Sequence, residues 1–199
     1  MKKYSYLTAA FTMSTAMILS GCSGSDEEAS ADEEDIVETA ESGNPQPNEA
    51  FSDIDITGDG EIPEGLEMAE DPAFAEGDTV TINASHFPGM EGAEGTVVGA
   101  YQTNAYSISY EPSDGGDMVE DYHWVIDEET FSSSLQAPYE EGAEVEITAQ
   151  RVDGMYGVMA EIHSVQEDAT VYMVDFSLTD REETVLNYKW LAEDELSAQ

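Results

Sequence analysis

Oxygen-bearing side chains at alternate positions form the first pattern in this sequence that has the spacing of a binding site. They lie in residues 53–64, and the donors are Asp53, Asp55, Thr57 and Asp59. Calcium takes roughly six to eight oxygen ligands, which an EF-hand loop supplies at alternate positions before closing with a bidentate glutamate. Counted from Asp55, the closing position is Leu66, and Pro63 interrupts the run. Calcium binding is one hypothesis for this segment, and the acidic end of a linker is the other.

A single cysteine, Cys22, stands where a lipid could be attached. Lys2 and Lys3 precede an uncharged, mostly apolar stretch that ends in Leu19-Ser20-Gly21-Cys22, the form of a bacterial lipobox. Such a stretch is too short for a stable membrane-spanning helix and is typical of a cleaved export signal. We predict a signal peptide over 1–21, lipidation at Cys22 and an extracytoplasmic chain anchored to the membrane. With one cysteine, no disulfide can form within the chain.

Patterns typical of enzymes are missing from the sequence. It has no Ser-His-Asp order, no phosphate-binding glycine loop and no closed His/Cys zinc pattern. Acidic side chains occur throughout, so that no pair of carboxylates stands out as an acid and base. We therefore predict that the protein is not an enzyme.

An internal repeat must position whatever site the chain contains. Residues 74–130 and 139–196 carry one pattern twice, in which Gly89-Met90 matches Gly154-Met155 and Trp124 matches Trp190. The spacing is 65 residues up to the Gly-Met pair and 66 afterwards. A duplication this clear predicts two copies of one fold.

Each copy has the composition of short antiparallel strands. β-branched and aromatic residues alternate in 79–82, 96–98 and 106–110, and again in 145–148 and 171–176, with glycines between them. We predict an all-β protein made of two tandem small SH3-like barrels, because closing a barrel removes the exposed sheet edges. The predicted domains are an acidic linker over 22–60, a first repeat over 61–134 and a second repeat over 135–199. The linker is too poor in apolar residues to offset the entropy of ordering.

The charge of the chain limits its partners. It carries 45 Asp and Glu against five Lys and Arg, a formal net charge of −40. After Cys22 the basic residues are Arg151, Arg181 and Lys189. Nucleic acids and anionic lipid surfaces repel such a chain, so we predict that it binds neither. Acidity throughout the repeats, with lysine nearly absent, is typical of adaptation to a saline habitat, where salt screens the repulsion.

Five motifs make the sequence similar to a known family, the YdhK-like bacterial lipoproteins. They are Ile-Pro-Glu-Gly-Leu at 62–66, Gly-Met-x-Gly at 89–92, Ala-Tyr-x-x-x-Ala-Tyr at 100–106, Gly-Gly at 115–116 and His-Trp-Val at 123–125. The resemblance covers residues 60–197 and implies a tandem domain of unassigned function behind a lipid anchor. Some relatives are described as extracellular copper-binding lipoproteins of the CopL type, which implies copper(I) buffering for metal tolerance.

The resemblance implies a copper site at His86, Met90 and His123. Thioethers and imidazoles suit copper(I), and the family turn usually reads His-Met-x-Gly-Met. The first copy keeps His86 and Met90, whereas the second keeps only Met155. His123 lies one position beyond the place of a family histidine, on the opposite face of a strand. Any such site is therefore expected in the first repeat, with the second as scaffold; packing of Met90 in the core is the alternative.

Two functions follow from the sequence as hypotheses of different classes. The first is a lipid-anchored binding module, with copper(I) as the candidate metal. The second is a structural or interaction protein of the cell envelope that has no metal site and contacts an envelope protein or a cell-wall polymer.

Overall fold

Two long strands, β3 and β7, form the central pair of the protein. The computed structural model describes residues 57–199. β3 (Glu94–Tyr110) has 17 residues and β7 (Met159–Ser177) has 19. They pair antiparallel from Gly95 opposite Phe176 to Tyr110 opposite Ala160, with three register shifts. The segments 96–98 and 106–110, predicted as separate strands, are therefore parts of one strand.

The other elements attach to this pair. They are β1 (Glu67–Met68), β2 (Thr79–Ile82), β4 (Val119–Ile126), β5 (Thr130–Phe131), β6 (Glu144–Ile147), β8 (Thr184–Ala192) and β9 (Leu196–Ala198), with 3-10 turns η2 (Asp127–Glu129) and η3 (Glu193–Glu195). The all-β prediction is confirmed. Within residues 57–199, no helix is long and apolar enough to cross a membrane.

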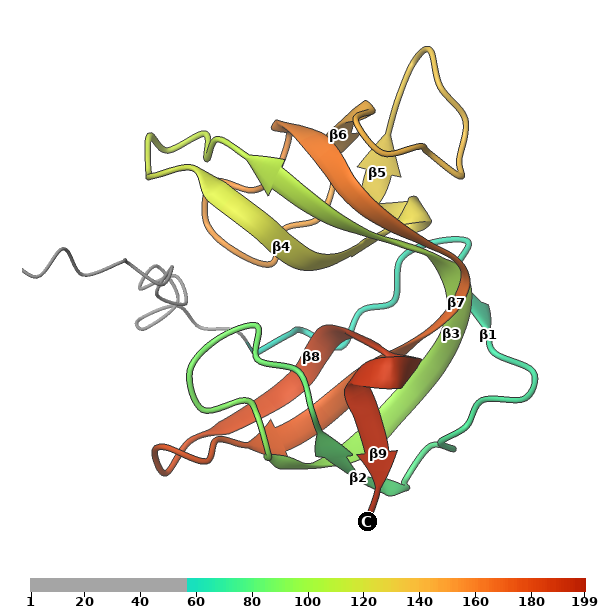
Figure 1. Ribbon diagram of the computed structural model, residues 1–199, viewed down its shortest axis with the longest axis vertical. Helices are drawn as coiled ribbons and strands as arrows, with labels where there is room; N and C mark the ends of the chain where they lie inside the picture. The colour runs from blue at the N-terminus through green and yellow to red at the C-terminus, as the bar shows by residue number, and fades with distance from the viewer. Residues whose placement is uncertain (1–56) are drawn as a thin grey trace, which may run out of the picture. The chain divides into compact units, whose positions relative to one another are not determined.

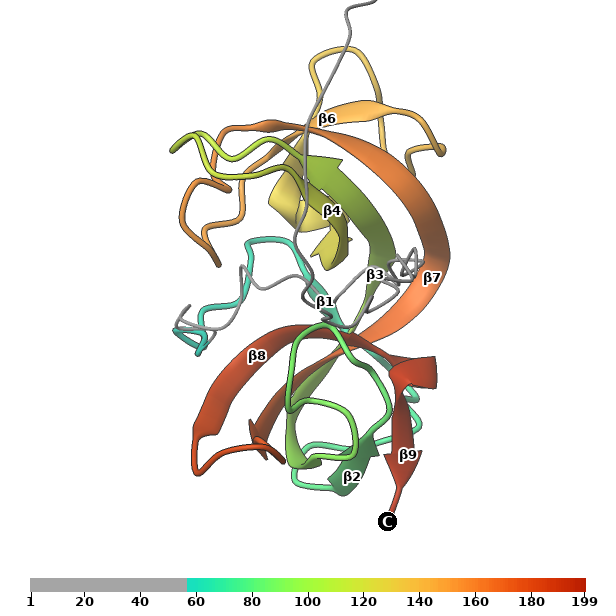
Figure 2. The ribbon, with the colours of Figure 1, turned by 60° about the vertical axis from the view of Figure 1, so that its left-hand side comes forward.

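The nine strands of residues 57–199 form one sheet that does not close. Its order is β5-β6-β7-β3-β2-β9, with β1 and β4 also paired to β3 and β8 to β7. β4, β5 and β6 gather around one end of the long pair and β2, β8 and β9 around the other (Figures 1 and 2). The prediction of two SH3-like barrels is not confirmed, because a continuous sheet runs through both repeats.

The two repeats exchange halves to build two apolar cores, which define lobe A and lobe B. Lobe A packs the start of the first repeat against the end of the second, and lobe B packs the remaining halves together. The lobe A core includes Ile82, Phe87, Met90, Val174 and Tyr188. The lobe B core includes Tyr106, Val125, Ile147, Met155 and Ile162. Each repeat is thus a unit of sequence that depends on the other for its core.

A third apolar cluster lies where β3 and β7 pass from one lobe to the other. Trp124 and Trp190 belong to it, together with Tyr101, Ile126 and Val171. Trp190 is completely buried and Trp124 is 5% exposed. The two equivalent tryptophans therefore lie in the apolar cluster that joins the two lobes.

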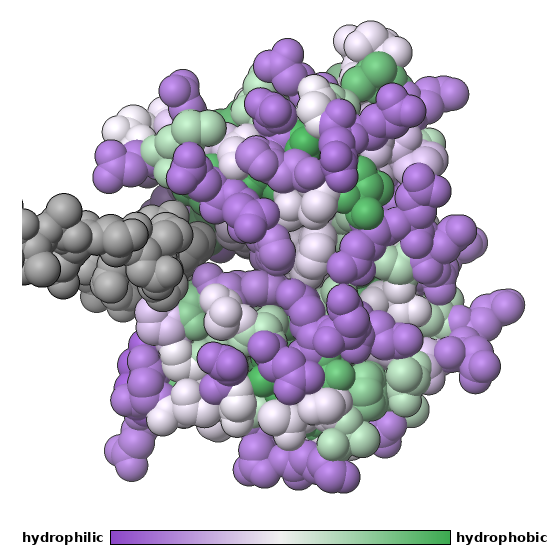
Figure 3. Space-filling view, in the orientation of Figure 1, coloured by the Kyte–Doolittle hydropathy of each residue, from purple (hydrophilic) through white to green (hydrophobic). Residues whose placement is uncertain are grey.

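The protein surface is largely hydrophilic, and because the chain is strongly acidic, salt should stabilise the fold. Hydrophilic side chains cover most of the face in Figure 3, on a chain with a formal net charge of −40. Because screening shortens the range of repulsion to about 3 Å at 1 M salt, we expect NaCl between 0.1 and 1 M to raise the melting temperature by about 4 °C or more. Differential scanning calorimetry tests this, with glycerol of equal osmolality as control. An unchanged melting temperature would contradict the repulsion argument.

Several predicted features lie outside the described residues. They are the signal peptide 1–21, the lipidation site Cys22, linker residues 22–56 and the calcium donors Asp53 and Asp55.

Candidate metal site

His86, His123 and Glu195 converge at the wall of a cavity between lobes A and B. One potential ligand atom from each residue lies within 4.8 Å of those from the other two. The side chains are partly exposed, at 11% for His86, 27% for His123 and 16% for Glu195. The cavity has a volume of about 1030 Å³ and is lined by the turns after β2 and β6, by β4, β8 and η3, and by residues 57–59. The group is accessible to an ion from solvent.

A short loop anchored in the lobe A core positions His86. Phe87 and Met90 beside it are 4% and 0% exposed, and the backbone N–H of Asn83 donates to the Glu195 carbonyl at 2.8 Å. Gly89 allows the tight turn with φ at 87°. The loop is therefore fixed by two buried apolar side chains, and the imidazole that precedes them is directed toward Glu195.

A distortion near the start of β4 positions His123. The pairing of β3 with β4 shifts register between Tyr110 and Ile108, and Asp121 has a φ of 51°. Aspartate tolerates this left-handed conformation better than most residues, and such irregularities re-aim side chains. The His123 ring stacks on Trp124 at 4.3 Å and meets the His86 ring edge-on at 5.2 Å.

Glu195 is held by hydrogen bonds to one of its oxygens, which leaves the other toward the histidines. The indole of Trp124 and the backbone N–H of Ala192 donate to Oε2 at 2.8 and 2.9 Å. Oε1 lies 2.7 Å from His86 Nε2 and 3.9 Å from His123 Nδ1. Burial opposes ionisation of Glu195, but interactions with His123 and His86 lower its pKa to about 2. The carboxylate is thus negatively charged at neutral pH.

Each histidine uses one ring nitrogen toward Glu195 and the other toward a supporting residue. His86 Nδ1 lies 3.0 Å from the Tyr188 hydroxyl, and His123 Nε2 lies 3.0 Å from Asp121 Oδ1. Metal-binding histidines are commonly oriented through their second nitrogen in this way. Burial alone would lower the pKa of His123, but the carboxylates of Glu195 and Asp121 raise it above its usual value.

The structure separates the ligand set that the resemblance implies. His86 and His123 come together, although the strand position of His123 suggested otherwise. Met90 is fully buried in the lobe A core. Glu195 comes from the second repeat, so the group combines both copies instead of belonging to the first alone. Two of the predicted calcium donors lie within the described residues: Asp59 pairs with Lys189 Nζ at 3.0 Å, and the Thr57 hydroxyl accepts the N–H of Leu186 at 3.4 Å.

Sequence reasoning missed Glu195, Asp121 and Tyr188. One signal was available, because Glu129 and Glu195 each follow the repeated tryptophan by five residues. In a chain with 45 acidic residues that coincidence carries little weight.

The chain is similar in sequence to a family of known proteins. Residues 76–127 and 141–193 each match the family described as "Protein of unknown function (DUF1541)". The chain is 38% identical over 201 residues to the uncharacterized protein YdhK of Bacillus subtilis (strain 168), covering all of this chain and 92% of that protein.

Solved structures give the same result. The crystal structure of ydhK from Bacillus subtilis, a DUF1541 family protein, matches with a TM-score of 0.69 and 44% identity over 74% of this chain and 99% of that chain. The solution structure of the ydhK C-terminal domain matches with a TM-score of 0.59 and 46% identity over 63% and 94%. The duplication predicted from the sequence is confirmed, and no enzyme family is evident among these matches.

Proposed function

The chain belongs to the DUF1541 family, and we propose that it is a lipid-anchored extracytoplasmic module that binds one transition-metal ion through His86, His123 and Glu195. The observation that carries the proposal is the convergence of three ligand atoms within 4.8 Å at a cavity wall. Two imidazoles and a carboxylate leave further coordination positions open toward the cavity. Such a site suits capture and release of an ion, which agrees with a buffering role.

The donor set favours copper(II) among the candidate metals. Imidazole and carboxylate suit borderline divalent ions, and affinity along the first transition row is highest for copper(II). The resemblance implies copper(I), whose preferred thioether ligand would be Met90. Because Met90 is 0% exposed within an apolar core, the proposal takes copper(II) as the ion bound and zinc(II) as its weaker competitor.

Binding of a metal ion would rearrange the hydrogen bonds of His86. In the structure, His86 Nε2 and Glu195 Oε1 form a 2.7 Å hydrogen bond. A bound ion would take the lone pairs of both atoms, and the imidazole proton would then lie on Nδ1, where the Tyr188 hydroxyl can accept it. Tyr188 and Asp121 keep the outer nitrogens of the two rings engaged while this happens. The negative charge of the chain attracts cations to the cavity.

Metal titration of the full chain tests the proposal. Isothermal calorimetry should give one equivalent of copper(II), and His86→Ala should weaken binding by about 100-fold, because it removes one of three ligands. His163→Ala is the matched control, since His163 is an exposed histidine of β7. Equal affinity of the His86 variant and wild type would overturn the site. Binding no stronger than that of unstructured acidic peptides would favour an envelope interaction protein without metal.

The membrane anchor has a separate test. Lipidation at Cys22 is supported by the preceding Leu19-Ser20-Gly21 and by the apolar stretch before it. We expect the wild-type protein, expressed in a bacterium that processes lipoproteins, to partition into Triton X-114. Cys22→Ser should move it to the aqueous phase. Partition of both into the same phase would rule the lipid anchor out.

A further inference from the structure

Glu129 has surroundings that repeat those of Glu195. We call Glu195 with His86 and His123 the first half-site, and Glu129 with the residues equivalent to them the second half-site. Its Oε2 accepts hydrogen bonds from the Trp190 indole at 3.1 Å and from the Ile126 N–H at 3.3 Å. These donors are the repeat equivalents of Trp124 and Ala192, which hold Glu195. The Glu129 carbonyl accepts the N–H of Thr148 at 2.8 Å, as the Glu195 carbonyl accepts that of Asn83. The duplication therefore built two carboxylate sites on one cavity.

Arg151 occupies in this second half-site the position that His86 has in the first. The two residues are 65 positions apart, the spacing of the repeats in this region. Arg151 Nη2 lies 3.0 Å from Glu129 Oε2, as His86 Nε2 lies 2.7 Å from Glu195 Oε1. The guanidinium lies 5.5 Å from the ring centre of Tyr122, the equivalent of the tyrosine beside His86.

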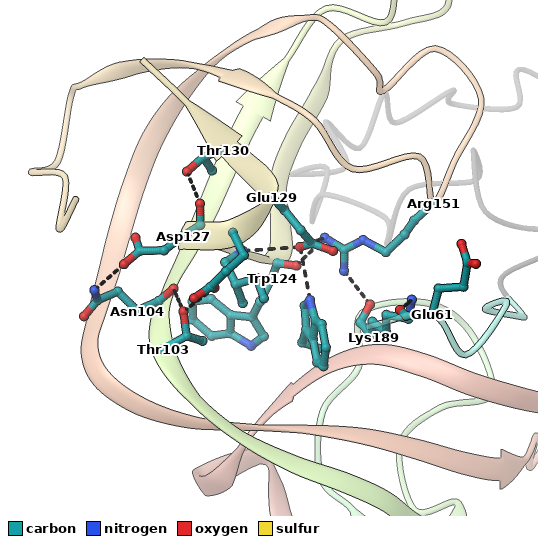
Figure 4. A network of polar contacts seen from close by, with 12 residues as sticks. Glu61, Thr103, Asn104, Trp124, Asp127, Glu129, Thr130, Arg151 and Lys189 are labelled. Atoms are coloured by element: carbon teal, nitrogen blue, oxygen red, sulfur yellow. Dashed lines mark hydrogen bonds and ion pairs between the residues drawn. The ribbon is translucent and has the colours of Figure 1, made fainter. Parts of the chain in front are cut away.

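The guanidinium also joins the two lobes. Its Nη1 donates to the Lys189 carbonyl at 2.5 Å and its Nη2 to the Trp124 carbonyl at 2.7 Å, as Figure 4 shows. Lys189 is the repeat equivalent of His123, and its ammonium pairs with Asp59 at 3.0 Å. The Arg151 side chain is only 13% exposed. Where the first half-site has two titratable imidazoles, the second has two permanent cations.

We propose that Arg151 and Lys189 are internal cations that occupy the second half of a duplicated cation-binding site. Their charges balance Glu129 and Asp59 without any bound ion, so the chain takes one metal ion instead of two. The second half-site is a permanent cross-link between the lobes, and the first is the exchangeable one. The stoichiometry of one rests on the proposed function, whereas the cross-linking role of Arg151 does not depend on it.

Restoring imidazoles in the second half-site tests the proposal. The double substitution Arg151→His and Lys189→His should raise zinc(II) stoichiometry in calorimetry from one to two. Adding His86→Ala to that double variant should return it to one. Arg181→His is the control, since Arg181 pairs with Glu183 at 2.8 Å outside the cavity, and it should leave the stoichiometry at one.

The outcomes separate this inference from the proposed function. If wild type and the double variant both bind one ion, the inference is overturned and the function stands. If wild type binds none and the double variant binds one, the function fails and the inference stands. Should the double variant melt below 37 °C, the inference requires zinc(II) to raise its melting temperature more than that of wild type. The cross-link itself predicts that Arg151→Lys melts at a higher temperature than Arg151→Gln, and equal melting would count against it.

Discussion

Replacing Trp190 with alanine is expected to destabilise the fold by about 4 kcal/mol, a large fraction of the roughly 5–15 kcal/mol that stabilises a typical domain. Trp190 is fully buried in the cluster that both repeats share, and its ring meets Tyr101 edge-on at 5.6 Å. Truncation leaves a cavity and removes the indole N–H that donates to Glu129 at 3.1 Å. Urea unfolding followed by far-UV circular dichroism measures the loss.

Two further variants divide the contributions of Trp190. Trp190→Phe keeps most of the ring volume but no donor, and should cost about 1–2 kcal/mol through loss of the hydrogen bond to the Glu129 carboxylate, which keeps Ile126 and Arg151 as donors. Tyr156→Ala changes a residue that is 58% exposed and should alter stability by less than about 0.5 kcal/mol. A Trp190→Ala variant as stable as the Tyr156 variant would show that the central cluster does not hold the repeats together.

Glu129→Gln and Glu195→Gln are expected to have opposite consequences, although the two residues are repeat equivalents. Glu129→Gln leaves Arg151 without its carboxylate and should lower stability by about 3 kcal/mol, because both partners are largely buried. Metal affinity should stay within about threefold of wild type. Glu195→Gln removes a ligand and should weaken copper(II) binding by about 100-fold, or roughly 2.7 kcal/mol.

Chemical unfolding and metal titration of the same two proteins provide the check. Each variant serves as the matched control of the other, because the substitution and the surrounding hydrogen bonds are alike. Equal losses of metal affinity would mean that both carboxylates bind metal. That result would contradict the proposal that Glu129 serves the Arg151 cross-link and only Glu195 binds an exchangeable ion.

The sequence predicts the local elements of this fold better than their pairing. Alternation of apolar residues locates β2 at 79–82, and the buried Tyr106, Tyr172, Trp124 and Trp190 are recognisable as core. The exchange of halves between repeats is a long-range property. No periodicity distinguishes Tyr106 packing with its own repeat from Tyr106 packing with Met155 of the other.

The same limit applies to the candidate site. His86 and His123 can be identified from residue type, but their proximity depends on the irregular start of β4 and on the loop that Met90 anchors. Glu195 comes from 72 residues farther along the chain than His123. Glu195 can be identified as a candidate ligand only from the hydrogen bonds that Trp124 and Ala192 donate to it, and no sequence pattern reveals these bonds.

X-ray absorption at the copper edge, on the full chain loaded with one equivalent of copper(II), tests the central claim most directly. Binding by His86, His123 and Glu195 predicts a first shell of nitrogen and oxygen at roughly 2.0 Å, with outer-shell scattering from two imidazole rings that falls to one in His86→Ala. A sulfur shell at roughly 2.3 Å, or a spectrum that His86→Ala leaves unchanged, would contradict it.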